Sequence, residues 1–466
     1  MLTRFVSSIV FLSVIAACAW AQEGSITGSV RDASGAIIPN ATVSVTSTEQ
    51  GFTRNVTTNA SGDYLVSGLQ PGHYNIVVTA PGFQRFEVKD LILRVAEKSR
   101  ADATLVVGQV SSEVTVEGTG VAQVQTESAE LSGVVTNKQI NQLVLNGRNF
   151  TQLVTLIPGV SNQTGQDEGQ VGVYGSVAFS VNGGRTEYNN WELDGGDNMD
   201  NGSNSTLNTY PNVDAIAEVK VLTSNYGAQF GRNGSATVET ITKSGTQQFH
   251  GDLFEFVRNN DFNARNFFLP NVPEYRKNDY GFTIGGPVFI PKVYNTSKQK
   301  TFFFYSQEWR KDVVPGQNFN QQVPSNAERS GNFSDVCPGA GSAVNTKLYP
   351  NCPVVPAGYP GAGSYFPNNT VPVTPQAQAM LPLLPTANSG SGVNSFFVAS
   401  PATSTDWREE LVRVDENITD KERFFFRYLH DSWNTTVPVP LWSATTASFP
   451  TVQTGFVGPG TSLVAN

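Results

Sequence analysis

Few side chains in this sequence of 466 residues could bind a metal or carry out catalysis. The three histidines lie in separate segments, without the spacing of metal ligands: His73, His250 and His430. Oxygen-bearing side chains that could hold Ca²⁺ gather in one run, but without the order and closing glutamate of an EF-hand loop: Asp194, Asp197, Asn198, Asp200 and Asn201. Zinc-protease, phosphate-binding and nucleophile-elbow motifs do not occur in the sequence. We therefore expect no catalytic residue, cofactor or metal, and we assign the oxygen-rich run to turns and hydrogen bonds.

The N-terminus has the form of an export signal. Arg4 precedes an apolar run from Phe5 to Ala17, which is too short to span a bilayer. Ala19-Trp20-Ala21 then has the spacing of a cleavage site, which predicts a signal peptide over residues 1–21. An alternative stays open, because Ile15-Ala16-Ala17-Cys18 resembles a bacterial lipobox that would leave Cys18 lipidated. Either route exports the chain.

Two cysteines lie beyond this signal, Cys337 and Cys352, in a stretch rich in Pro and Gly. In an oxidising compartment such a pair most simply forms one disulfide that closes a loop. Chain entropy gives roughly 3 kcal/mol for a loop of this size. A two-cysteine metal site is the alternative, and the lack of nearby histidines in the sequence disfavours it.

Composition favours β structure and argues against a nucleic-acid partner. The chain contains 43 Gly, 29 Phe and 14 Tyr, which suit strands joined by tight turns. Its formal net charge of −9 would repel a polyanion.

Residues 24–108 alternate apolar and polar side chains, with turn signals such as Ser61-Gly62-Asp63 between the runs. This pattern predicts an all-β sandwich. The segments "GSVRDASGAIIPNATVSV" and "TTNASGDYLVSGLQPGHYNIVVTAPGF" resemble the carboxypeptidase regulatory-like (transthyretin-like) domain. The resemblance implies a domain without peptidase chemistry, with His73 at its surface. Some relatives of this sandwich bind sugars, so a carbohydrate contact stays open as a weaker possibility.

Residues 125–246 mix short helices with short strands. One apolar helical face is expected to contain Ile140, Leu143 and Val144, and Asn146-Gly147 would end that helix. A second short helix is expected from about Phe150 to Leu156, before a Pro-Gly pair.

Alternating strands return from Phe249 onward. Five are expected: Phe249–Arg258, Asp279–Val288, Thr301–Lys311, Asp406–Asp415 and Glu422–Asp431. Segments of about ten residues, apolar outside and polar or small inside, are typical of a transmembrane β-barrel. The connection from 312 to 405 is long, as outward loops of such barrels are. A soluble two-sheet domain is the alternative, but it rarely tolerates so long a connection.

Three ordered blocks carry a more specific resemblance: "LNGRNFTQLVTLIPGV", "VNGGRTEYNNWELDGGDN" and "IAEVKVLTSNYGAQFGRNGSATVETITKSGT". They resemble the plug domain of TonB-dependent outer-membrane receptors, and more narrowly the Oar-like branch, which also carries a regulatory-like domain in front. The motif positions matched are Asn146, Gly147, Arg148, Asn182, Gly183, Arg185, Asp194, Gly195, Tyr226, Gly227, Gly231, Arg232, Thr242, Lys243, Ser244 and Gly245.

The resemblance implies a mostly β protein of the bacterial outer membrane. We expect a periplasmic Ig/transthyretin-like sandwich over 24–108, an α+β plug over 125–246 and the first strands of an antiparallel barrel over 247–466. Such a barrel has ~22 strands, whereas five are visible and the last residues show no strand pattern. We therefore expect the sequence to be an N-terminal fragment of a longer protein.

The function implied by the resemblance is energised uptake of a large solute, such as a siderophore, oligosaccharide or peptide. A TonB-type protein would pull an extended segment through strand pairing and so displace the plug. In the connector 109–124, "SSEVTVEG" is the candidate segment, with Glu113, Val114, Thr115 and Val116 as partner-binding residues. The alternative is that it forms the last strand of the sandwich.

Three motif arginines, Arg148, Arg185 and Arg232, are expected to pair with carboxylates of the barrel wall rather than to bind substrate. Substrate contacts are expected at 160–180 and 194–212, where Gly, Asn and Tyr suggest loops. The second hypothesis is a surface adhesion or carbohydrate-binding protein that the barrel merely anchors. It differs from uptake in needing no energising partner.

Overall fold

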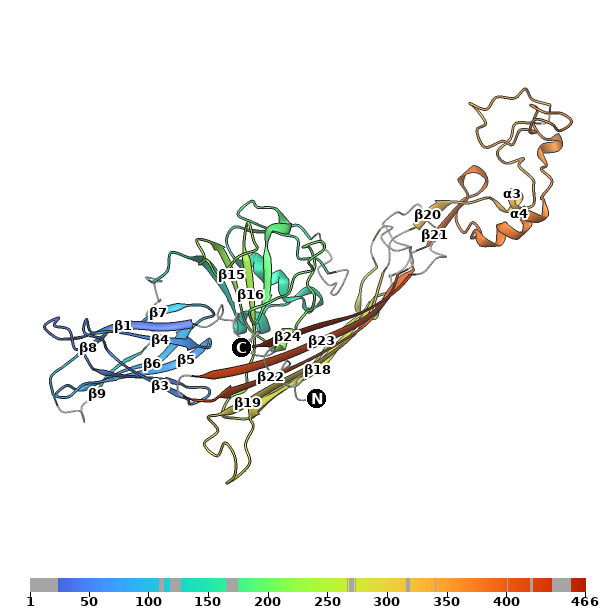
Figure 1. The fold of residues 1–466 in the computed structure, drawn as a ribbon. Helices are drawn as coiled ribbons and strands as arrows, with labels where there is room; N and C mark the ends of the chain where they lie inside the picture. Colours follow the sequence, from blue (N-terminus) through green and yellow to red (C-terminus); the bar gives the residue numbers. More distant parts are fainter. Residues whose placement is uncertain are drawn as a thin grey trace, which may run out of the picture.

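The computed structural model describes residues 24–108, 113–117, 127–164, 175–265, 267, 272, 274–315, 319–339, 341–399, 401–419, 422–437 and 454–466. They form an N-terminal sandwich, a plug unit of short strands and helices, and a curved sheet, the wall, which carries a separate outer loop region (Figure 1). The predicted signal peptide and the lipidation alternative at Cys18 lie outside the described residues. No described helix is long and apolar enough to cross a membrane.

The sandwich consists of two sheets of short strands. The first sheet orders β4 (Asp63–Leu69), β1 (Gly24–Asp32) and β7 (Lys98–Arg100), and β8 (Ala103–Leu105) also pairs with β1. The second sheet orders β3 (Thr53–Thr57), β2 (Thr42–Ser47), β5 (Gly72–Thr79), β6 (Arg85–Leu93) and β9 (Glu113–Glu117). Alternate side chains of these strands point inward and form one apolar cluster, so the sandwich predicted from alternation is confirmed.

The plug unit is a five-stranded sheet covered by short helices. Its strands are, in order, β10 (Leu131–Thr136), β15 (Ile216–Ser224), β16 (Thr237–Thr242), β13 (Asn190–Leu193) and β14 (Gly196–Asp197), and β11 (Val160–Asn162) pairs separately with β12 (Phe179–Val181). Its helices are α2 (Asn137–Gln142), η2 (Asn146–Arg148), η3 (Phe150–Leu156), η5 (Thr186–Tyr188) and η6 (Val213–Ala215). Phe150 and Phe179 pack on Trp191 at the centre, and Trp407 of the wall joins the same apolar cluster.

Ile140, Leu143 and Val144 were predicted to share one apolar helical face. This prediction is wrong for Leu143 and Val144. A capping box at Thr136 starts α2, but the helix ends at Gln142. Leu143 is already extended, with φ −81° and ψ 137°. Only Ile140 therefore reaches the core, whereas Leu143 and Val144 are exposed. The second helix has the predicted bounds but is of the 3-10 type.

The wall is an antiparallel sheet of six strands in chain order: β17 (His250–Asn259), β18 (Arg276–Pro287), β19 (Thr301–Pro315), β22 (Ala402–Asn417), β23 (Arg423–Val437) and β24 (Thr454–Ala465). The 3-10 turn η7 (Asn260–Phe262) follows β17. The five predicted strands are present, and several extend further at the end that leads to the outer loop region. The expectation of no strand near the C-terminus is wrong, because β24 pairs with β23 over its whole length.

β24 escaped prediction because glycine and proline interrupt its alternation. Gly460 faces the plug, and a Cβ there would lie 2.5 Å from the backbone oxygen of Asn208. The close approach of plug and wall therefore requires glycine at this position.

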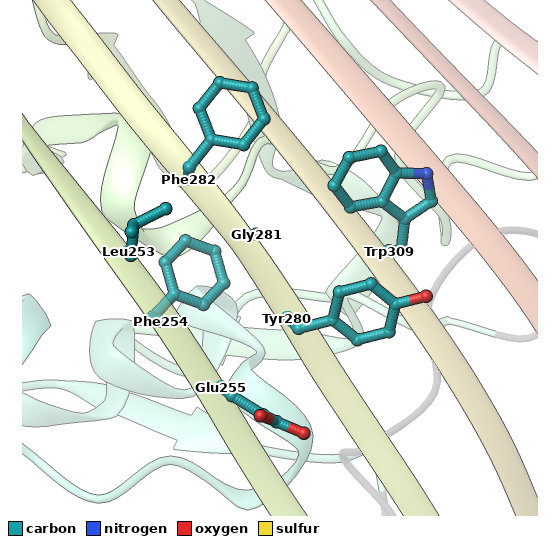
Figure 2. A pocket seen from close by; sticks show the side chains of 7 residues that line it. All are labelled: Leu253, Phe254, Glu255, Tyr280, Gly281, Phe282 and Trp309. Carbon is teal, nitrogen blue, oxygen red and sulfur yellow. The ribbon is translucent and has the colours of Figure 1, made fainter.

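The two faces of the wall differ in chemistry. Side chains turned toward the plug are largely charged and buried, among them Glu308, Arg413 and Arg427. Figure 2 shows the rings of Tyr280, Phe282 and Trp309 on the other face, with the plug behind the sheet. The Tyr280 and Trp309 rings stack with centroids 5.6 Å apart. An aromatic outer face and a polar inner face match the predicted barrel pattern.

The outer loop region lies between β19 and β22, at the end of the wall opposite the sandwich (Figure 1). It contains β20 (Phe319–Gln322) paired with β21 (Phe396–Ala399), and the helices α3 (Asn326–Arg329), α4 (Pro375–Met380), η8 (Pro367–Asn369), η9 (Leu381–Leu383) and η10 (Gly392–Asn394). Cys337 and Cys352 form a disulfide there, with their Cα atoms 4.9 Å apart.

Because the sandwich has its own apolar core, residues 24–117 should fold alone, and two leucines of β4 provide a matched pair. Leu69 is fully buried, whereas the side chain of Leu65 is 60% exposed. Leu69→Ala should lower the free energy of unfolding by about 2–4 kcal/mol, and Leu65→Ala by no more than about 0.5 kcal/mol. Urea denaturation followed by circular dichroism measures both. Equal losses would contradict the assignment of the core.

Candidate gating contacts between plug and wall

Asp194 joins the plug to two strands of the wall. It follows β13 in an Asp-Gly turn, where Asp194 and Gly195 have φ of 48° and 78°, as such pairs favour. Its Oδ1 accepts a hydrogen bond from Arg413 Nη1 (3.2 Å) and its Oδ2 accepts one from Arg427 Nε (3.0 Å). Thr242 donates its backbone N–H (2.9 Å) and its hydroxyl (2.8 Å) to the same carboxylate. All these side chains are buried, so a fully hydrogen-bonded ion contact holds the plug here.

Arg148 makes a second connection to the wall. Its Nε lies 3.3 Å from Asp279 on β18, and its Nη2 lies 2.5 Å from Asp214 within the plug. Arg310 on β19 donates to the Arg148 carbonyl oxygen at 3.4 Å. The Arg148 guanidinium also lies 4.2 Å from the centre of the Phe256 ring on β17. One plug arginine therefore contacts three neighbouring wall strands.

All three motif arginines were predicted to pair with carboxylates of the wall. The prediction is correct for Arg148 and wrong for Arg185 and Arg232. Arg232 pairs with Asp197 of the plug. Arg185 lies 5.9 Å from the ring centre of Tyr188, also in the plug. Both arginines lie in connections between plug strands: Arg232 reaches Asp197 of β14, and Arg185 lies beside η5, which contains Tyr188.

The other motif positions lie in plug turns and strand ends. Asn182 and Gly183 form a second turn of positive φ, and Asn182 Nδ2 donates to the Thr223 carbonyl oxygen at 3.1 Å. Asn146 and Gly147 lie in η2, and Gly227 and Gly231 lie between β15 and β16. The Tyr226 hydroxyl bonds to Asn233 in that same turn. Lys243, Ser244 and Gly245 link the last plug strand to the first wall strand.

The oxygen-rich run is spread over separate partners. Asp194 binds the wall arginines, Asp197 pairs with Arg232, and Asp200 accepts from the backbone of Gly202 at 2.9 Å. Asn198 bonds to Thr209. Within the described residues, His, Cys, Asp and Glu form no group of three that could hold a metal ion.

The candidate partner-binding residues Glu113, Val114, Thr115 and Val116 lie in β9, parallel to β6. The segment is thus the last described strand of the sandwich, the alternative left open by the sequence. It is also the end strand of its sheet. Ser111, Ser112 and Gly118 of the same segment lie outside the described residues.

The wall partners of Asp194 are functional residues that the sequence did not reveal as such. Arg413 and Arg427 stand at inward positions of β22 and β23, among apolar and aromatic neighbours. An arginine at an inward position between apolar neighbours, such as Arg413 between two valines and Arg427 within an aromatic run, is the signal that could have indicated them, because its charge requires a buried partner.

A buried acidic group lies in the plug sheet. Glu239 on β16 is fully buried, and neither carboxylate oxygen has a hydrogen-bond partner among the described residues. The pKa of Glu239 is raised to about 8, mainly by burial and in addition by the nearby Glu192, while Lys220 opposes the rise.

Three family models match successive parts of the chain. The carboxypeptidase regulatory-like domain matches residues 25–106, the TonB-dependent receptor plug domain 124–238, and an outer membrane beta barrel domain 241–462. The chain belongs to the TonB-dependent outer-membrane receptors. This family membership places it in the bacterial outer membrane.

Three proteins similar to this TonB-dependent receptor are distant from it in sequence. It is 25% identical over 295 residues to the TonB-dependent transporter Oar of Myxococcus xanthus, covering 59% of this chain and 26% of the relative. The chain thus spans about a quarter of that relative's length. The ferric enterobactin receptor of Pseudomonas aeruginosa is 12% identical, with a TM-score of 0.34 over 65% of this chain and 33% of its own. The siderophore receptor PirA of Acinetobacter baumannii is 12% identical, with a TM-score of 0.32 over 72% of this chain and 44% of its own.

Asp194→Asn should loosen the plug, because it leaves two buried guanidinium groups without their shared carboxylate. Breaking a buried pair costs about 3–5 kcal/mol, so the opening free energy of β16 should fall by an amount of that order. Hydrogen exchange of β16 amides in the intact, detergent-solubilised receptor measures it. Asp200→Asn, at an exposed turn, is the matched control and should leave β16 unchanged. Equal effects of the two variants would contradict the role of Asp194.

Glu239 predicts a pH dependence of plug stability. Its pKa in the fold is raised to about 8 from 4.5, so the folded state keeps a proton that the unfolded state releases between these values. Stability should therefore fall as pH rises from about 4.5 to about 8, by up to about 1.4 kcal/mol per pH unit. Glu239→Gln should flatten this slope, whereas Glu187→Gln, at an exposed position, should keep it. The opening free energy of β16, corrected for intrinsic exchange at each pH, tests both.

Proposed function

We propose that the receptor takes up a large solute across the outer membrane when its plug is displaced, without covalent chemistry. The observation that carries the proposal is the polar contact between plug and wall. Asp194 and Arg148 hold the plug by hydrogen bonds and ion pairs, which water can replace once the surfaces separate. An apolar seam of the same extent would resist separation, because its surface would be exposed to water.

A TonB-type protein is the proposed source of force. β9 is the end strand of its sheet, so an extended segment of a partner can pair with it or take its place beside β6. β9 also precedes the plug in the chain, which places the pulling point N-terminal to the part that has to move.

The proposed solute site lies where the plug and the outer loop region face outward. Segments 160–180 and 194–212 remain the proposed contact regions of the plug, apart from Asp194, Asn208 and Tyr210, which contact the wall. Residues 165–174 lie outside the described part. Siderophore, oligosaccharide and peptide are the solute classes considered. Two structural neighbours are receptors for iron chelates, but identities of 12% do not transfer that choice to this chain.

Adhesion through the sandwich is the less favoured function. The sandwich lies at the end of the wall opposite the outer loop region (Figure 1), and so we place it in the periplasm. A surface adhesin would need it outside. A carbohydrate contact by this domain stays a weaker proposal.

Removal of residues 113–117 tests the uptake proposal. In the intact receptor at normal surface level, this deletion should abolish accumulation of the solute that the wild-type strain takes up, identified by growth on a panel of nutrients. Deleting the energising partner should have the same effect. Unchanged surface binding together with unchanged uptake in both strains would favour adhesion instead.

A further inference from the structure

The sandwich contacts the plug through the turn Arg94–Ala96, between β6 and β7. The Val95 backbone N–H donates to Glu218 Oε1 at 2.9 Å. Lys220 Nζ donates back to the Val95 and Ala96 carbonyl oxygens, at 3.0 Å and 3.4 Å. Arg94 also lies 3.5 Å from Glu218. At this contact β15 contributes the charged side chains of Glu218 and Lys220. The turn contributes mostly backbone groups, together with the side chain of Arg94.

The sequence of β15 is adapted to this contact. Val219 and Val221 point into the plug core, whereas Glu218 and Lys220 point to the opposite face of the sheet. Lys220 is nevertheless only 1% exposed. A lysine is rarely buried without partners, because burial of its charge is costly. The Lys220 ammonium finds them in the sandwich backbone and in Glu130, at 2.7 Å.

The sandwich also contacts the wall, through the side chains of two glutamines. Gln70 Nε2 donates to Asp415 Oδ1 at 2.8 Å, and Gln50 Oε1 accepts from Arg423 Nη2 at 3.2 Å. Asp415 is held in addition by Arg413, the arginine that binds Asp194. One chain of hydrogen bonds thus runs from the sandwich through the wall to the plug.

The sandwich also reaches the segment that joins plug and wall. Gln50 Nε2 donates to the Gly245 carbonyl oxygen at 3.1 Å, and the Gln247 backbone N–H donates to the Glu49 carbonyl oxygen at 2.9 Å. A plug that leaves the wall has to move relative to this segment. The sandwich, fixed to both sides, opposes that motion.

We propose that the sandwich is a releasable clamp, which holds the plug against the wall until it is pulled away. Its contacts are hydrogen bonds and ion pairs, which can be exchanged for water. β9 belongs to the sandwich and lies N-terminal to the plug, so force applied at β9 loads the clamp before the plug (Figure 1). Only the source of this force rests on the proposed function.

The test removes the glutamine side-chain contacts from the sandwich side, in the intact, detergent-solubilised receptor without partner or solute. Gln50→Leu/Gln70→Leu should accelerate hydrogen exchange of the Val95 and Gln247 amides, which donate across the interface, by at least about fivefold. The Tyr210 amide, which donates from the plug to Asp431 of the wall at 3.2 Å, should accelerate with them. Faster exchange at Val95 without any change at Tyr210 would overturn the clamp.

A matched control uses the same chemical change elsewhere on the sandwich. Gln84→Leu, near Gly108, should leave all three amides within about twofold of wild type. An equal acceleration in this control would also overturn the proposal. The Val78 amide, in the ladder between β2 and β5, reports whether the sandwich stays folded.

A second pair of variants approaches the interface from the plug. Lys220→Met should accelerate exchange at Val95, whereas Lys98→Met, at an exposed position of β7, should not. Because no partner or solute is present, these results are independent of uptake. Loss of transport in a strain without the energising partner tests the proposed function alone.

Discussion

The buried contact of Asp194 with Arg413 and Arg427 is the interaction on which the arrangement of plug and wall depends. Three charged groups are removed from water there. Asp194 is compensated by the two arginines and Thr242, Arg413 also binds Asp415, and Arg427 also donates to Ser462 and to the Leu193 carbonyl oxygen. Partial separation would leave the buried Asp194 carboxylate without its two arginines, which is costly. The contact therefore favours the assembled position of the plug over partly separated ones.

Apolar packing supports this contact without dominating the junction. Trp407 of the wall joins the core of the plug. A second apolar cluster joins Leu193 and Ala215 of the plug to three wall residues: Phe304, Leu411 and Leu429. Buried charged side chains of the wall, such as Arg413 and Arg427, lie among these apolar groups. The plug's own core, around Trp191, packs its sheet and short helices together. The cohesion of the plug is thus mainly apolar, whereas its attachment to the wall also uses buried charged groups.

Alternation in the sequence was enough to predict the sandwich and five wall strands, because a sheet with two different faces imposes a period of two. It failed for β24, where contact with the plug selects glycine at position 460 instead of an alternating side chain. The helical pattern failed for Leu143 and Val144, because the helix ends at Gln142 and leaves these two apolar side chains exposed. A local sequence pattern cannot reveal where a helix or strand ends when tertiary contacts determine that position.

The candidate site was only partly predictable. The oxygen-rich run was assigned to turns, and Asp194-Gly195 at its start adopts positive φ. Arg148 was correctly predicted to pair with a wall carboxylate, whereas Arg232 pairs within the plug. The sequence alone does not distinguish a plug loop that faces the wall from one that faces another part of the plug. The partner of Asp194 lies 219 positions away. Such a pair is defined by the register of strands and not by any local motif.

Gly460 has a consequence for the evolution and engineering of this receptor. The plug backbone at Asn208 occupies the space that any larger residue would need. Plug and wall must therefore change sequence together at this point, and a chimera that combines the plug of one homologue with the wall of another has to match the two surfaces here before it can assemble.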